Sequence, residues 1–317
     1  VLAQFPDGQP VYGRIGKDAV EALLCKYYLN AEVFTGTAMY DKCWEHAQNI
    51  IGRHQGGGYQ NSGLANNYLA LFCGNNDMFM PGGSLPAQNE ILWGIPYDSN
   101  NTQPYGGTMF LICAPIKDAA TDDQIGQGWC NKTYYGMNSA WGCMRTTPEF
   151  SRIFGFVGGK SIDKRSALWL TEANDAGYPM DFKNPTDWNG CGYSAIKWTN
   201  CMADVEGTLP VWTDPANGWT RVGIQPVDAQ FNFPNTDLPI IRLADVYLMA
   251  AESAMRGAGD QGKALEYVNL IRTRAGLTAW NAAELTLDNI LDERARELYQ
   301  ELSLIHISEP TRQAEIS

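Results

Sequence analysis

The chain has 317 residues, of which 35 are acidic and 23 basic, so its formal net charge is −12. This balance argues against nucleic acid as a partner, because phosphate binding requires a clustered basic surface. The sequence contains no run of about 18 apolar residues, so no segment is predicted to span a membrane. The length permits one or two domains, and we predict one.

Two amphipathic helices are predicted near the start, from Lys17 to Leu29 and from about Met39 to Ile51. In both segments apolar residues recur at steps of three and four. We expect them to pack as a pair covering about residues 17–52. Cys25 and Cys43 fall on the apolar faces and are predicted to be small core residues.

Histidine is scarce, which removes most catalytic options. The chain has three histidines, and His306 lies close to its end. We expect His46, on the more polar side of its helix, to be solvated. His54 follows the predicted helix end, where a partly positive imidazole suits the carbonyl dipole.

Residues 53–238 carry most of the glycines, prolines and tryptophans and few long periodic runs. We predict a loop-rich insertion on a helical scaffold, with short strands in WGIPY and TMFLICAPI. Binding residues are often held on loops by rigid elements, so recognition is expected in this region.

The densest group of candidate binding residues lies in residues 127–150. Aromatic rings alternate there with amides and an arginine, a combination that suits a sugar: a ring stacks on the C–H face, and polar side chains bind the hydroxyls. A second wall is expected just after the predicted WGIPY strand, although an ordinary polar turn explains that stretch equally well. The predicted ligand-binding residues are Trp129, Tyr134, Tyr135, Asn138, Trp141, Arg145, Tyr97 and Asp98.

Other motifs in the insertion do not support catalysis or metal binding. The GFVGGKS run at 155–161 has three residues between the two relevant glycines where a phosphate-binding loop needs four, so we interpret it as a surface turn. The eight cysteines include no CxxC pair, which disfavours zinc. Disulfides such as Cys130 with Cys143, or Cys191 with Cys201, remain open. We predict no cofactor and no metal.

Carboxylates keep a hydrolase hypothesis open, because a glycoside hydrolase needs two of them across a sugar site. Nothing in the spacing singles out a pair. The acidic residues considered are Asp122, Asp123, Asp175, Asp181 and Asp187.

Three helices are predicted between residues 239 and 301. The first begins at Pro239 and stops at the Gly257 and Gly259 pair; the second runs from about Gly262 to Ala275, with Gly276 as its C-terminal cap. Such pairs are the unit of tetratricopeptide-type solenoids, which bury their cores by stacking. The charged residues expected to pair between these helices are Arg242, Asp245, Glu252, Arg272, Arg274, Glu293, Arg294 and Glu297.

The runs RLADVYLMAAES, VNLIRTRAG and LDERARELYQE, together with GRIGKDAVEALLCKYYLNAEVFTG and NEILWGIPYD, resemble the RagB/SusD family of nutrient-uptake outer-membrane lipoproteins. The resemblance spans about residues 13–301 and implies a mainly α fold: a SusD-like tetratricopeptide-type scaffold with a large loop-rich insertion containing short strands. Asp163, Lys164 and Arg165 match a D-x-R element of the family, which we interpret as structural.

The resemblance also implies a function. It predicts non-catalytic glycan binding at the cell surface and delivery to a SusC-type TonB-dependent transporter. Membrane attachment would come through an N-terminal lipid anchor that we expect to be missing from this chain, which we interpret as an internal fragment. Residues 302–317 resemble a translated sequencing adapter, and we expect them to lie outside the native fold. The alternatives are a secreted carbohydrate-active hydrolase and a tetratricopeptide-type scaffold for peptides.

Overall fold

The computed structural model describes residues 2–6, 10–55, 63–77, 90–116, 132–171, 192–204, 209–213, 220–224 and 232–301. The chain divides into two compact units. The helical unit comprises Val1–Leu64, Asn89–Gly94 and Pro239–Ser317. The loop-rich unit comprises Ala65–Gln88 and Ile95–Leu238.

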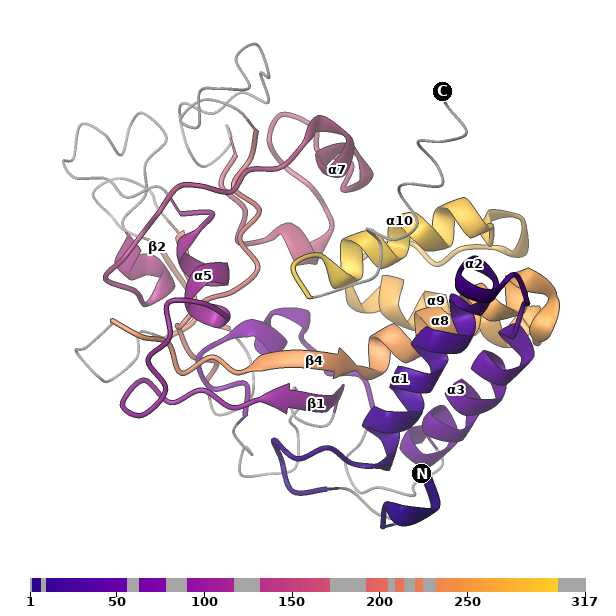
Figure 1. The fold of residues 1–317 in the computed structure, drawn as a ribbon. Helices are drawn as coiled ribbons and strands as arrows, with labels where there is room; N and C mark the ends of the chain where they lie inside the picture. Colours follow the sequence, from indigo (N-terminus) through magenta and orange to yellow (C-terminus); the bar gives the residue numbers. More distant parts are fainter. Residues whose placement is uncertain are drawn as a thin grey trace. The chain divides into compact units, whose positions relative to one another are not determined.

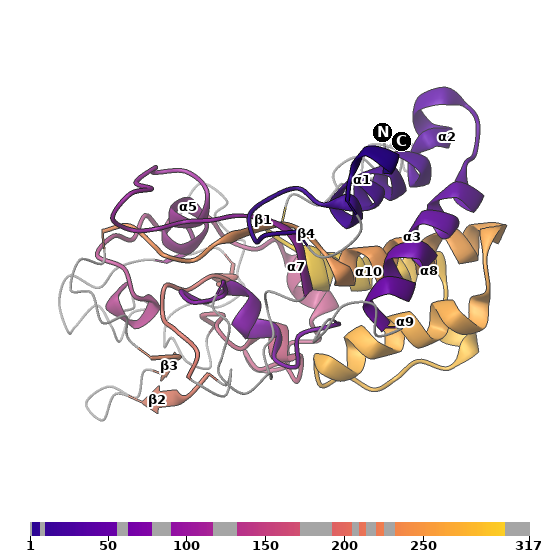
Figure 2. The ribbon, with the colours of Figure 1, turned by 90° about the horizontal axis from the view of Figure 1, so that it is seen from below.

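The helical unit is built from helices at both ends of the chain (Figure 1). Its elements are η1 (Leu2–Gln4), α1 (Lys17–Leu29), α2 (Ala31–Thr35), α3 (Tyr40–Gln55), α8 (Leu243–Ser253), η5 (Ala254–Ala258), α9 (Gln261–Arg274), η6 (Ala282–Glu284) and α10 (Leu287–Leu298). Helix α8 contacts α1, α3, α9 and α10, and Figure 2 shows it between α3 and α9. The predicted helix pairs are therefore confirmed, and α8 forms the centre of their common core.

Local signals set the helix ends. The Asp260 side chain accepts hydrogen bonds from two backbone amides at the start of α9, and Thr286 accepts one from the Asn289 amide at the start of α10. Gly276 follows α9 with φ +79°, which confirms it as the cap. Gly259 is needed for another reason: a Cβ there would lie 2.5 Å from the Trp44 ring.

One predicted boundary is wrong. Residues 238–242 do not begin a helix at Pro239; Leu238–Arg242 is the strand β4, which pairs with β1 (Ile91–Ile95). A single apolar run followed by a helix does not reveal where extended backbone ends. The partner strand lies far away in sequence, so the local pattern could not indicate it.

The predicted solvation of His46 is wrong, and His54 lies in the last turn of α3 rather than beyond its end. His46 is partly buried, stacks on Tyr28 with ring centroids 5.6 Å apart, and lies 3.2 Å from a Glu21 oxygen. His54 lies within α3, is only 5% exposed, and approaches Asp18 at 3.0 Å. All three partner residues belong to the neighbouring helix α1. Contacts with this helix therefore keep both imidazole rings away from bulk solvent.

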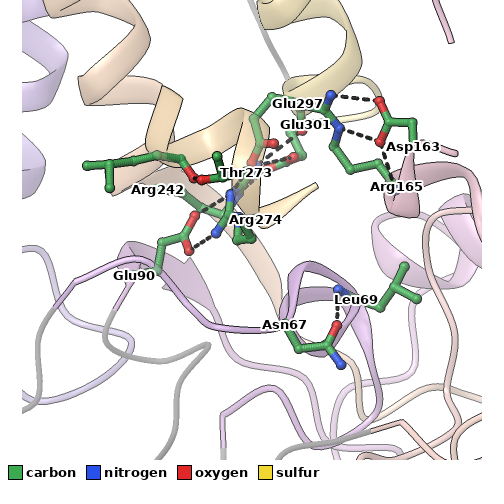
Figure 3. A network of polar contacts seen from close by, with 11 residues as sticks. Asn67, Leu69, Glu90, Asp163, Arg165, Arg242, Thr273, Arg274, Glu297 and Glu301 are labelled. Carbon is green, nitrogen blue, oxygen red and sulfur yellow. Dashed lines mark hydrogen bonds and ion pairs between the residues drawn. The ribbon is translucent and has the colours of Figure 1, made fainter. Parts of the chain in front are cut away.

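The predicted interhelical ion pairs are confirmed, and they form a buried network around Arg242 (Figure 3). Arg242 lies 2.5 Å from Glu90, 2.5 Å from Glu301 and 3.1 Å from Glu297. Arg274 lies 2.5 Å from both Glu90 and Glu297. Burial opposes the charge of Arg242, but the three carboxylates outweigh it and raise its pKa well above the ordinary value.

Smaller pairs extend this pattern. Asp245 lies 2.8 Å from Lys26 and 3.1 Å from Arg294, which joins α8 to α1 and α10. Glu293 lies 2.9 Å from Arg272, so α9 and α10 are joined as well. These pairs fix how neighbouring helices align.

The loop-rich unit contains short elements: η2 (Tyr68–Phe72), α5 (Thr108–Cys113), η3 (Lys132–Tyr135), α7 (Pro148–Ile153), η4 (Lys164–Ser166), β2 (Val211–Thr213) and β3 (Thr220–Val222). Strands β2 and β3 pair antiparallel, with Val211 opposite Val222. Trp169 and Trp198 are among its fully buried side chains. The pair formed by Asp163 and Arg165 is buried, with a 2.7 Å contact, as expected for a structural element (Figure 3).

The TMFLICAPI run is not a strand, which corrects the prediction. Residues 108–113 form α5, in which Met109, Ile112 and Cys113 are buried and Phe110 is 42% exposed. Buried positions separated by three and four residues follow the helical period. A short apolar run cannot be assigned to strand or helix by periodicity alone.

Candidate functional site

Two buried asparagines hold together four segments of the loop-rich unit, around residues 76, 136, 200 and 235–237. The Asn200 side-chain amide donates to the Gly136 carbonyl at 3.0 Å, and its oxygen accepts from the Asn235 amide at 2.8 Å. Asn76 donates to the Asp237 carbonyl at 3.0 Å and accepts from the Asp237 amide at 2.9 Å. Buried, satisfied amides of this kind specify one arrangement of the backbone.

The same frame positions the segment after β1. The Asp237 carboxylate accepts from the Tyr97 amide at 2.6 Å, and the Asn235 side chain accepts from the Ser99 amide at 2.9 Å. Residues 97–99 are thus tied to residues 235–237.

Tyr97 in turn fixes the turn that leads into α5. A Cβ on Gly107 would lie 1.8 Å from the Tyr97 hydroxyl oxygen, and Gly107 has φ +62°. Only glycine fits there, since both the space and the left-handed backbone exclude a side chain. Tyr97 is half-buried, and burial raises its pKa. Tyr97 therefore supports the turn that leads into α5.

Trp141 is held against α5 by backbone hydrogen bonds. Its amide donates to the Cys113 carbonyl at 2.9 Å, and the Gly142 amide donates to the Ile116 carbonyl at 2.8 Å. The indole therefore lies beside Phe110, with ring centroids 5.9 Å apart and planes inclined by 49°. Trp141 is half-buried and Phe110 partly exposed, so this pair offers apolar surface to solvent.

A second aromatic pair joins the stretch before α5 to residue 233. Tyr105 is 71% exposed and meets Phe233 edge to face, with centroids 5.6 Å apart. The exposed side chains of Asn138 and Asn232 approach at 3.5 Å and link the segment of Trp141 to that of Phe233. We call this group the aromatic surface: Tyr105, Phe110, Asn138, Trp141, Asn232 and Phe233.

The structure brings only some of the predicted binding residues to this surface. Trp141 and Asn138 belong to it. Tyr134 and Tyr135 are 7% and 5% exposed, so their rings lie in the interior of the loop-rich unit. Trp129 lies outside the described residues.

The two remaining predicted residues with known placement bind local backbone or side chains. Arg145 donates to the Pro115 carbonyl at 2.7 Å and is half-buried. Asp98 is exposed and accepts from the Asn100 amide at 2.9 Å, and this hydrogen bond together with the Asn101 side chain lowers its pKa. Their assignment to a binding site stays a prediction.

Sequence reasoning missed four members of the aromatic surface: Tyr105, Phe110, Asn232 and Phe233. A signal was present, because NFPN at 232–235 and PYGG at 104–107 combine an aromatic residue with turn formers. Neither stretch is dense enough in aromatics to stand out on its own.

The acidic residues considered for hydrolysis, and Cys130 and Cys191 of the open disulfide pairings, lie outside the described residues. Within the ranges that the structure describes, no group of three or more His, Cys, Asp or Glu side chains is arranged to hold a metal ion. None of the helices in those ranges is long and apolar enough to cross a membrane.

Comparison with known proteins addresses the family. Residues 224–303 match the model of the SusD family. The starch-binding protein SusD of Bacteroides thetaiotaomicron is 27% identical over 318 residues, an alignment that covers 92% of this chain and 51% of that protein. The resemblance to the RagB/SusD family is therefore confirmed. It spans about half the length of this relative.

Solved structures agree on the fold of the chain. A SusD-superfamily protein from Bacteroides fragilis matches with a TM-score of 0.56 at 18% identity, covering 93% of this chain and 54% of that one. Surface glycan-binding protein A from Bacteroides thetaiotaomicron matches with a TM-score of 0.53 at 20% identity, covering 98% and 57%. The mainly α, SusD-like fold class is therefore confirmed.

Proposed function

We propose that this chain binds glycan without cleaving it, and that the aromatic surface of the loop-rich unit is where the sugar stacks. The observation that carries the proposal is the presence of two partly exposed aromatic pairs on loops that are joined by the contact between the exposed amides of Asn138 and Asn232. Aromatic rings that stay exposed on loops held by a rigid scaffold often mark binding sites.

The chemistry of this surface suits a sugar. A pyranose ring presents C–H groups that stack on Trp141 or Tyr105, while its hydroxyls both donate and accept hydrogen bonds. Asn138 and Asn232 each supply a donor and an acceptor, and both are exposed. The naming of one SusD relative as starch-binding and of a structural neighbour as glycan-binding supports the same ligand class.

The wider role follows from the family. In this proposal the chain is one SusD-like domain, residues 1–301, with an insertion at about 53–238, held at the outer face of the outer membrane by a lipid anchor. It delivers oligosaccharide to a SusC-type TonB-dependent transporter. Co-expression with a SusC-type transporter, followed by affinity purification from detergent, tests this step; recovery of the chain alone contradicts it.

Replacing Trp141 by alanine tests the binding surface. Loss of an aromatic stacking platform weakens binding by about 1 to 3 kcal/mol, or roughly 5- to 150-fold in Kd. Isothermal titration calorimetry with maltoheptaose, and with a panel of other soluble oligosaccharides, measures the change. Phe110→Ala is expected to weaken binding as well, because Phe110 supports the indole.

Tyr27→Ala is the matched control, since Tyr27 is a 69% exposed aromatic residue in the helical unit. It should leave affinity unchanged. Equal affinities for wild type and a folded Trp141→Ala variant would remove Trp141 from the site. Release of reducing ends from any bound glycan would favour the hydrolase alternative, whereas peptide binding that survives loss of the aromatics would favour the scaffold alternative.

A further inference from the structure

Two cysteines lie close together in the core of the helical unit. Cys25 of α1 and Cys43 of α3 are both 0% exposed and belong to the same apolar cluster. The Cys25 sulfur lies 3.6 Å from the Cys43 carbonyl oxygen, so it reaches the backbone of the other cysteine. Both are reduced in this structure.

The packing around them is compatible with a bond between the sulfurs. Ala22 of α1 and Ala47 of α3 are fully buried beside the cysteines, and such small side chains let the two helices approach closely. The Cys43 sulfur makes a weak contact with the Met249 carbonyl oxygen, 3.9 Å away. If the Cys43 side chain turned toward Cys25, the loss of this contact would cost little stability. A disulfide requires the Cβ atoms of its two cysteines to lie at short range, which closely packed helices permit.

We infer that Cys25 and Cys43 form a disulfide that joins α1 to α3 when the chain folds in an oxidising environment. The cell-surface location is part of the proposed function, whereas the disulfide is argued from the sequence and the packing. An experiment can therefore refute one of them and leave the other standing.

The bond forms by thiol–disulfide exchange with a disulfide donor, such as a protein disulfide or oxidised glutathione. One cysteine thiolate attacks the donor and releases the first donor thiol; the second cysteine thiolate then attacks the mixed disulfide and releases the other. The donor disulfide takes up two electrons and the two protons lost by the cysteine thiols, and it leaves as two thiols.

The order of events is set by burial. The hydrogen bond with Cys43 and burial raise the pKa of Cys25, so the thiolate is scarce once the helices have packed. Exchange must therefore precede packing. Oxidised glutathione should cross-link the pair during refolding and leave it reduced when added to the folded, reduced protein.

The experiment refolds the full reduced chain in a glutathione redox buffer, blocks remaining thiols with N-ethylmaleimide in denaturant, and maps tryptic peptides by mass spectrometry. Trypsin places Cys25 alone in the peptide of residues 18–26 and Cys43 alone in that of residues 43–53. We expect these two peptides to be joined in the wild type. Cys25→Ala should leave the 43–53 peptide alkylated, whereas Cys113→Ala should retain the link.

The cross-link also has a stability readout. Closing a loop of about 18 residues lowers the unfolding equilibrium constant by about 200-fold, so mild reduction should shift the denaturation midpoint of the wild type and of Cys113→Ala but not of Cys25→Ala. Finding both peptides alkylated in protein that has regained its helical circular dichroism, or either one joined to a different cysteine peptide, overturns the inference.

Discussion

Replacing Arg242 by methionine should be among the most damaging single substitutions in the helical unit. The guanidinium is 1% exposed and contacts Glu90, Glu297 and Glu301. Methionine fills much of the volume but leaves buried carboxylates with less compensation. Breaking a buried pair on one side costs about 3 to 5 kcal/mol, and Arg274 retains contact with two of the three acids, so we expect the lower part of that range.

Urea unfolding followed by circular dichroism measures this cost. Arg256→Met is the control, because Arg256 is 36% exposed at its side chain and pairs with Glu252 at 2.9 Å on the surface. It should cost less than about 1 kcal/mol. If Arg242→Met costs no more than the control, the network does not stabilise the helical unit.

Two further predictions concern other buried contacts. Burial opposes ionisation of Asp18, but His54 and Arg53 outweigh it and lower the pKa of Asp18; its contribution is present above the unfolded pKa of about 3.9 and is lost as pH falls below it, so the urea midpoints of wild type and Asp18→Asn should converge in acid. A constant gap down to pH 2.5 would contradict this. Gly107→Ala should cost at least about 1 to 2 kcal/mol, because φ is +62° and the new Cβ meets the Tyr97 hydroxyl. Adding Tyr97→Phe should recover part of the loss in thermal unfolding; strict additivity of the two changes would show that the clash does not exist.

The helical unit shows how far sequence patterns reach. Apolar periodicity and the glycine after α9 suffice to place α1, α3, α9 and α10 within a few residues, because helices are stabilised by contacts three and four residues apart. The charges on these helices were also visible as candidates for pairing. The partner of each charge was harder to predict. Glu90 contacts Arg242 although the two are 152 residues apart in sequence, and no local pattern connects them.

Composition and periodicity by themselves determined that this is a mainly helical chain with a loop-rich middle, and the order of its motifs pointed to the SusD family. Only the tertiary structure decided which aromatic residues face solvent. Tyr134 and Tyr135 are buried. Trp141, a few positions later, packs against helix α5 beside Phe110 and is partly exposed. The difference arises from long-range hydrogen bonds made by Asn200 and by the backbone of Trp141, and such contacts orient a loop independently of its own sequence.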